Sequence, residues 1–167
     1  MKFRTLKADE IEVRVQSVTE KGAILLLYKD ARCDMNLLDE SGAPWKREHQ
    51  LIDNKLFCTV SIWDKDIEQW VSRQDVGTES NTEKEKGQAS DSFKRACFNW
   101  GIGRELYSSP FIWVGADRIN ITQKNGKLTT YDKFEVEAVE YNENKEITGL
   151  AIKNSKTGKR VYAWRTK

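Results

Sequence analysis

The residues best suited to binding chemistry lie between Asp75 and Tyr107, in the stretch DVGTESNTEKEKGQASDSFKRACFNWGIGRELY. The cations Lys94 and Arg95 precede Phe98 by four and three residues, so on a helix all three share one face. Two cations beside an aromatic ring can neutralise phosphates while the ring stacks on a base, as in non-specific single-strand binders. On spacing alone, the more ordinary interpretation is a solvated helix face with Phe98 buried by a neighbouring element.

A helix over about residues 81–100 would position these side chains. Ser80 and Glu83 have capping-box spacing at its start, and Gly101 favours its end. One face is apolar and predicts the core side: Ala89, Phe93, Ala96, Cys97 and Trp100. The opposite face carries Lys84, Asp91, Lys94, Arg95 and Phe98.

The rest of the chain reads mainly as antiparallel strands. We expect strands at about 11–16, 23–28, 56–63, 69–76, 111–114, 119–123, 128–131, 134–139, 147–153 and 160–164. Asp30 is expected to cap a short helix over 31–39, Trp45 to begin a return segment toward Leu51, and Asn125-Gly126 to form a hairpin turn. The pattern predicts an α+β fold, with antiparallel hairpins packed on a central helix and followed by a C-terminal β-meander.

Composition limits the classes of function. The 167 residues with 38% hydrophobic content fit a single domain over 1–167. No apolar run approaches eighteen residues and the first ten are charged throughout, so we expect a soluble, intracellular protein. A net charge of +2 is too small to mark the whole chain as a nucleic-acid binder, so cations would have to cluster. Cys33, Cys58 and Cys97 read as reduced thiols in packing roles, because there is no CxxC and only His49 could assist a metal site.

Several catalytic classes lack their motifs. No GxxxxGK[ST] occurs, so ATP hydrolysis is not expected, and one histidine with no nucleophile elbow gives no basis for a hydrolase triad. Two sets of acidic residues could be imagined as the metal ligands of a nuclease. One set is Asp64, Asp66 and Glu68, and the other is Asp132, Glu135 and Glu137. A hairpin loop and the wet face of a strand are the more ordinary interpretations, but a metal-dependent nuclease stays open as an alternative.

A longer pattern of residues extends around the central helix. It contains, in order, Tyr28, Arg32, Leu37-Leu38-Asp39-Glu40, Gly42, Trp45, Asp75-Val76-Gly77, Glu83-Lys84, Lys86, Ala89, Asp91, Phe93-Lys94-Arg95-Ala96 and Gly101. This pattern resembles the conserved domain of the Rad-fifty-two superfamily of single-strand annealing proteins, and most closely the short Sak-type members of phages, prophages and other mobile elements. The resemblance covers about Tyr28 to Tyr107, and its Asp-Val-Gly and Lys-Arg-Ala elements are its specific part.

The resemblance implies a β-β-β-α annealing core, at about 23–107, whose copies assemble into an oligomeric ring or helical filament. It implies that single-stranded DNA lies in a basic groove with its bases exposed, and that a complementary strand is annealed without ATP, bond-making chemistry, cofactor or metal. The setting would be recombination and DNA repair in the cytoplasm of a bacterial host, with a single-strand-binding protein or an exonuclease as further partners. The DNA-binding residues we expect are Arg32, Lys84, Lys86, Lys94, Arg95 and Phe98.

The resemblance ends after Phe111, where a β-rich extension over about 111–167 begins. Five of its cations could form a second DNA surface, or could simply keep turns soluble: Lys153, Lys156, Lys159, Arg160 and Arg165. The many short strands, with Trp63 and Trp70, leave open a barrel-type module that binds single strands without annealing them.

Overall fold

The computed structural model describes the backbone of residues 1–78 and 84–167, and the side chains of all of these except 84–86. The chain divides into two compact units, one formed by Met1–Arg4 with Asp30–Arg104 and the other by Thr5–Lys29 with Glu105–Lys167. The fold is α+β with mostly antiparallel strands, as predicted. The single domain with a core at about 23–107 stays a prediction; residues 23–29 belong to the second compact unit.

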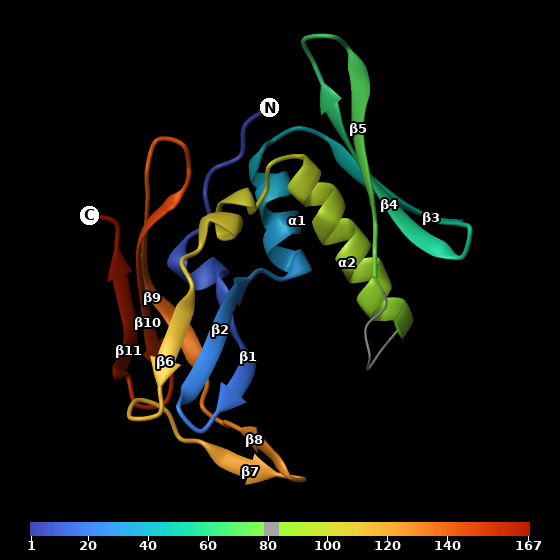
Figure 1. Cartoon of the computed structure of the whole chain (residues 1–167). Coiled ribbons are helices and arrows are strands. Elements are labelled where there is room, and N and C mark those ends of the chain that lie inside the picture. The colour runs from blue at the N-terminus through green and yellow to red at the C-terminus, as the bar shows by residue number, and fades with distance from the viewer. Residues whose placement is uncertain (79–83) are drawn as a thin grey trace. The chain divides into compact units, whose positions relative to one another are not determined.

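The first unit is a three-stranded antiparallel sheet with two helices. Its elements are α1 (Ala31–Glu40), β3 (Trp45–Ile52), β4 (Lys55–Asp64), β5 (Gln69–Val76) and α2 (Lys84–Asn99). The strand order is β3-β4-β5, and α2 lies across one face of this sheet (Figure 1). Strand alternation turns Cys58, Val60 and Ile62 of β4 toward that face, where all three are buried.

Packing between α2 and the sheet centres on Phe93, which is fully buried. Its ring stacks on Trp45 of β3 with ring centroids 6.2 Å apart. Trp100 donates its indole N–H to the Val60 carbonyl oxygen at 3.0 Å. These contacts join the middle and the end of α2 to neighbouring strands, and so fix which face of the helix points outward.

The approach of α2 to the end of β5 requires a glycine. A Cβ at Gly77 would lie 2.2 Å from the Gln88 carbonyl oxygen and 2.8 Å from the Ser92 nitrogen, both backbone atoms of α2. Any larger residue there would therefore push the helix away from the strand.

The cap of α1 follows the sequence prediction. The Asp30 side chain accepts a hydrogen bond from the Cys33 backbone N–H at 2.8 Å, which satisfies a donor that the first helical turn leaves unpaired. At the other end of α1, Arg4 donates through Nε and Nη2 to both carboxylate oxygens of Glu40, each at 2.8 Å. The prediction of a capped helix over 31–39 is confirmed.

The second unit is built on a six-stranded sheet in the order β11-β10-β9-β1-β2-β6. Its elements are η1 (Ala8–Glu10), β1 (Glu12–Thr19), β2 (Gly22–Tyr28), η2 (Arg104–Ser108), β6 (Ile112–Gly115), β9 (Phe134–Tyr141), β10 (Ile147–Asn154) and β11 (Arg160–Arg165). Hydrogen bonds connect the two ends of this sheet. Arg118, shortly after β6, donates to the Val161 carbonyl of β11 at 3.3 Å, and the Tyr162 hydroxyl of β11 donates to the carbonyl of Phe111, just before β6, at 3.4 Å. The sheet thus curls until its outer strands approach each other.

A separate two-stranded hairpin, β7 (Thr122–Lys124) and β8 (Lys127–Thr129), belongs to the same unit. Its turn residues Asn125 and Gly126 have φ of 50° and 76°, which is the left-handed geometry of a two-residue hairpin turn. The predicted Asn-Gly turn is confirmed. None of the helices in the described ranges is long and apolar enough to cross a membrane.

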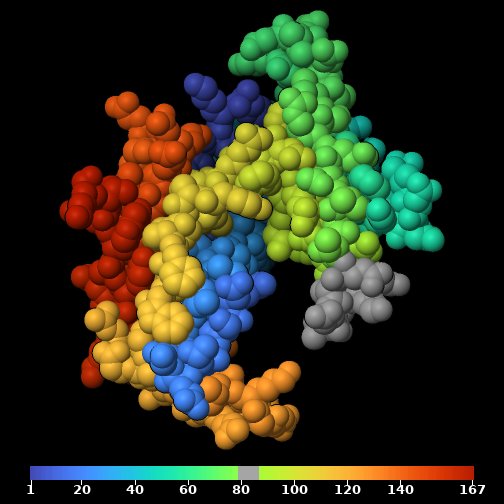
Figure 2. All heavy atoms as spheres, in the orientation of Figure 1, coloured from blue at the N-terminus to red at the C-terminus, as the bar shows by residue number. Residues whose placement is uncertain are grey.

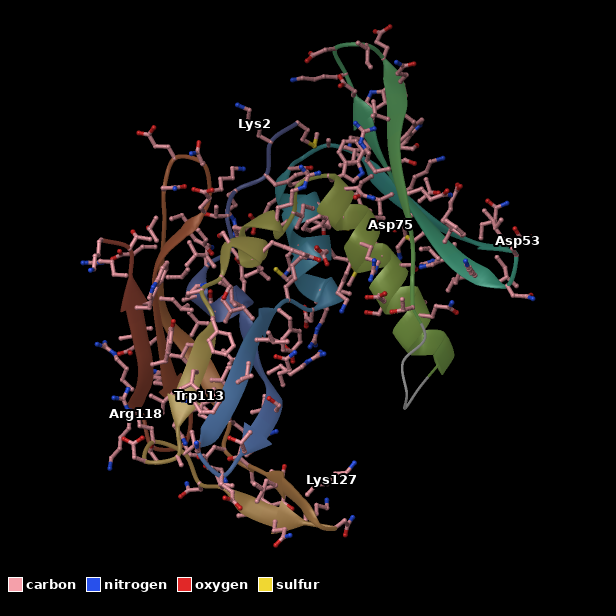
Figure 3. All side chains as sticks on the ribbon, viewed as in Figure 1. Lys2, Asp53, Asp75, Trp113, Arg118 and Lys127 are labelled. Atoms are coloured by element: carbon pink, nitrogen blue, oxygen red, sulfur yellow. The ribbon has the colours of Figure 1, made fainter. Side chains whose placement is uncertain are left out.

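The segment from Trp45, expected only as a return toward Leu51, is the strand β3, which pairs with β4 through a turn at Asp53 and Asn54. Asp53 is labelled at that turn in Figure 3. The expected capping box of Ser80 and Glu83 lies outside the described residues.

Candidate nucleic-acid interface

The outward face of α2 carries the Lys94, Arg95 and Phe98 side chains that spacing predicted to lie together. The buried stripe on the other side is confirmed at Phe93, Ala96 and Cys97, which have no exposed surface. Arg95 is exposed, whereas Lys94 and Phe98 are half-buried. The predicted separation of apolar and cationic faces therefore holds in this part of the helix.

Arg95 is held in place by Asp91, one helical turn earlier. The Arg95 Nε lies 3.0 Å from the Asp91 Oδ2, and that oxygen also accepts hydrogen bonds from the Thr78 backbone N–H at 2.9 Å and the Thr78 hydroxyl at 3.1 Å. Among the residues that the structure describes, the two terminal nitrogens of Arg95 have no hydrogen-bond or ion-pair partner. The ion pair orients the guanidinium, and no described residue binds its outer edge.

The environment of Asp91 keeps its carboxylate charged. Partial burial alone would raise its pKa, but the hydrogen bonds from Thr78 and the positive charge of Arg95 outweigh it, and the pKa of Asp91 falls below its ordinary value. Asp91 consequently stays ionised near neutral pH and retains its hold on Arg95.

Arg104 completes this face, although it was not among the DNA-binding residues expected from the sequence. Its Nε donates to the Phe98 carbonyl at 2.8 Å and its Nη2 to the Asn99 carbonyl at 2.9 Å, so it caps the end of α2. Its guanidinium carbon lies 5.5 Å from the centre of the Phe98 ring, within cation–π range. We call Lys94, Arg95, Phe98 and Arg104 the α2 strip.

A signal for Arg104 was present in the sequence. It follows Gly101 and Gly103, the residues that indicated the end of the helix, and a cation just past a helix end can reach the last free carbonyls. Asn99, in the last turn, bonds to the neighbouring strand β5, through Nδ2 to Asp75 Oδ2 at 3.1 Å. Figure 3 labels Asp75 on β5 beside α2.

The other predicted DNA-binding residues are not joined to this strip. Arg32 lies in the first turn of α1 with 84% of its side chain exposed, and its Nε pairs with Asp30 Oδ2 at 3.0 Å. Within the described residues no hydrogen bond or ion pair links Arg32 to the strip. Lys84 and Lys86 lie in the first turn of α2, and their side chains are outside the described part of the structure.

Two further arginines border α2 from the sheet. Arg47 of β3 lies over the Phe93 ring, with its guanidinium carbon 4.8 Å from the ring centre, and Arg73 of β5 lies over Trp100 at 5.1 Å. Both are exposed residues on the helix-facing side of their strands. Strand alternation could have indicated Arg73, whereas Arg47 was hidden because β3 was not recognised as a strand.

In the C-terminal extension, three of the five predicted cations pair with glutamates of β9. Lys153 Nζ lies 3.0 Å from Glu135 Oε1, Arg160 Nε 2.7 Å from Glu137 Oε2, and Arg165 pairs with Glu140. The hydrogen bond from Arg160 lowers the pKa of Glu137, so that carboxylate stays charged. Lys156 and Lys159 lie exposed in the turn between β10 and β11. The second DNA surface stays a prediction, with most of its charge compensated locally.

The carboxylates considered as nuclease ligands have other contacts. Glu135 and Glu137 form the ion pairs just described, Asp132 accepts hydrogen bonds from Asn120, and Asp64 accepts one from the Asp66 N–H at 2.9 Å. Within the part of the chain that the structure describes, no three His, Cys, Asp or Glu side chains are grouped so that they could hold a metal ion.

No protein-family model, no curated protein and no solved structure matches this chain.

Proposed function

We propose that this protein binds single-stranded DNA along the α2 strip and anneals complementary strands without ATP, acting as an oligomeric ring or filament. The observation that carries the proposal is the setting of Arg95: one nitrogen is tied to Asp91, its outer nitrogens are unpartnered among the described residues, and the Phe98–Arg104 pair lies one turn away.

Such a site suits a phosphate backbone. A guanidinium presents donors in a fixed fork that matches two phosphate oxygens, and less conformational freedom is lost on binding when the side chain is already oriented. Phe98 with Arg104 provides a ring and a planar cation, the two groups on which unpaired bases commonly stack. Contacts to phosphate and to base faces leave the Watson–Crick edges of the bases free to pair.

Annealing additionally requires that two polyanions approach each other. Cations along the bound strand lower this repulsion, but a chain of net charge +2 supplies few of them per copy. Assembly would repeat the α2 strip along the DNA. The three-stranded sheet supports assembly, because β3 and β5 are both edge strands of eight residues without proline, and edge strands can pair with another chain. The β-β-β-α core of the proposal is this sheet with α2.

The test follows the pairing of two complementary, end-labelled oligonucleotides by fluorescence, with EDTA and without ATP. The parent protein should accelerate pairing, and Lys94→Ala/Arg95→Ala should lose most of that acceleration while keeping the oligomer size. A matched control, Lys55→Ala/Lys65→Ala, removes two exposed lysines from the same unit and should anneal like the parent. The strip variant should also weaken the salt dependence of single-strand binding, by a log–log slope of about 0.7 for each lost phosphate contact.

Other outcomes of this test would favour a different function or a different role for Lys94 and Arg95. Unchanged or slowed pairing with the parent protein would refute annealing and favour the barrel-type binding module. Magnesium-dependent loss of the oligonucleotides would favour the nuclease. Loss of the oligomer in the strip variant would assign Lys94 and Arg95 to a subunit interface.

A further inference from the structure

The β7–β8 hairpin projects from the six-stranded sheet of its unit, and Lys127 is labelled at its tip (Figures 1 and 3). In Figure 2 the same segment, in orange, is open to solvent. Residues 122–127 are all exposed. The tip of the hairpin is therefore accessible to solvent.

The β7–β8 hairpin places two lysines opposite each other. The register sets Lys124 directly opposite Lys127, and like charges at such a pair destabilise a two-stranded ribbon. From Ile119 to Tyr131 the chain contains no Asp or Glu. In the six-stranded sheet, by contrast, Lys153, Arg160 and Arg165 each form an ion pair with a glutamate of β9. A bound polyanion would relieve the repulsion that the register creates.

The nearest carboxylate downstream is already used to fix the base of the hairpin. Asp132 Oδ2 accepts the Asn120 backbone N–H at 2.8 Å, and Asp132 Oδ1 accepts the Asn120 side-chain amide at 3.1 Å. This clamp ties together the two chain segments that enter and leave the hairpin. It sets the direction of the ribbon without neutralising the lysines at its tip.

The side chains of one face all carry hydrogen-bond donors, of which the Thr122 hydroxyl already donates to the Thr129 carbonyl at 3.5 Å. Because strand residues alternate, Lys124 and Lys127 share a face with the cross-strand pair Thr122 and Thr129. No aromatic residue occurs between Thr122 and Thr129, so this ribbon cannot supply the base stacking typical of single-strand binding. Duplex DNA needs no such stacking, has the higher charge density, and admits a two-stranded β-ribbon in its major groove.

We propose that the β7–β8 hairpin is a second nucleic-acid contact that grips the phosphate backbone of duplex DNA. Its place in the reaction, holding the newly annealed product, rests on the proposed function. Binding of duplex by the hairpin itself does not, because it can be measured on preformed duplex.

The test measures fluorescence anisotropy of a labelled 30-base-pair duplex, and of one of its strands alone, across a series of salt concentrations. Lys124→Ala/Lys127→Ala in the full chain should weaken duplex binding and reduce its log–log salt slope by up to about 1.8, or about 0.9 for each phosphate contact. Single-strand binding should remain at the parent level. Lys124→Arg/Lys127→Arg should bind the duplex like the parent, and Lys7→Ala/Lys21→Ala, an equal charge loss at two exposed positions of the same unit, should leave duplex binding unchanged.

Several results would overturn the proposal. They are no measurable duplex binding by the parent, an unchanged duplex slope in the hairpin variant, or an equal loss in the Lys7/Lys21 variant. Equal weakening of single-strand and duplex binding would refute the duplex assignment. The Lys94/Arg95 variant separates this proposal from the proposed function, since it should lose single-strand binding while the hairpin contribution to the duplex slope remains.

Discussion

Replacing Gly77 by alanine should separate α2 from the sheet and so test the link between fold and site. The added Cβ would lie 2.2 Å from the Gln88 carbonyl oxygen, 2.8 Å from the Ser92 nitrogen and 3.0 Å from the Ser92 Cβ. Non-bonded heavy atoms pack at about 3.5–4.0 Å. The end of β5 and the middle of α2 must therefore move apart by roughly 1 Å or more, the gap between these distances.

The expected cost is large because neither side of this contact can yield easily. Overpacking a well-packed site costs about 1–3 kcal/mol, and the upper part of that range applies where backbone atoms clash. Ser92 is fully buried, and the Gln88 side-chain amide donates to the Gly77 carbonyl at 3.3 Å. We expect Gly77→Ala to lower the free energy of unfolding by about 3 kcal/mol.

Urea unfolding followed by tryptophan fluorescence would measure this loss. The matched control is Gly115→Ala, whose Cβ would meet the Asp117 Oδ1 at 2.6 Å. That atom is the end of an exposed side chain that can rotate away, so the control should cost less than about 1 kcal/mol. Gly77→Ala should also reduce single-strand binding, because Thr78 would no longer hold Asp91, which positions Arg95.

Two results would refute this reasoning. An unfolding midpoint for Gly77→Ala equal to that of the parent would show that α2 does not approach β5 as described. Equal losses in the two variants would indicate a general effect of removing glycine, rather than a clash with the backbone of α2.

Two further predictions concern protonation. The pKa of Asp91 is lower in the folded chain than the ordinary aspartate value of about 3.9. The ionised Asp91 carboxylate therefore stabilises the fold above about pH 3.9, and this stabilisation is lost as the pH falls through the folded pKa. The urea midpoints of the parent and Asp91→Asn should differ at pH 7 and converge at acid pH. Burial raises the pKa of the Cys58 thiol to about 11, against a weaker opposing effect of Arg47. An unfolded thiol loses its proton at about pH 8.5, so the free energy of unfolding should fall as the pH rises above about 8.5. Cys58 should react with a thiol reagent at pH 8 only in denaturant, and rapid labelling of the folded protein would contradict its burial.

Much of the fold could be predicted because the local signals were strong. In β4 the apolar residues Cys58, Val60 and Ile62 alternate with more polar ones, and in α2 the positions of Phe93, Ala96 and Cys97 repeat at helical spacing. Asn125-Gly126 is a turn signal that needs no tertiary context. The paired lysines that flank this turn follow directly from its register.

Other features depend on partners that are remote in sequence. The strand β3 reads WKREHQLI, which lacks apolar alternation, because Arg47 and Trp45 cover the edge of Phe93 instead of filling a core. Its turn uses Asp53 and Asn54 at φ of 47° and 60°, without the glycine that usually marks such a turn. The sequence set Asp91 on the same face as Arg95, but it could not reveal that Thr78 shares its carboxylate.

Charge compensation, more than total charge, separates the surfaces of this chain. The cations of β10 and β11 and the glutamates of β9 cancel at short range, so a phosphate approaching them would have to displace a bidentate partner such as Glu137. Asp91 engages only Nε of Arg95, and the register sets Lys124 against another lysine. A net charge of +2 can therefore coexist with two sites suited to a polyanion, because pairing at short range, and not the total charge, decides which cations keep donors for a phosphate.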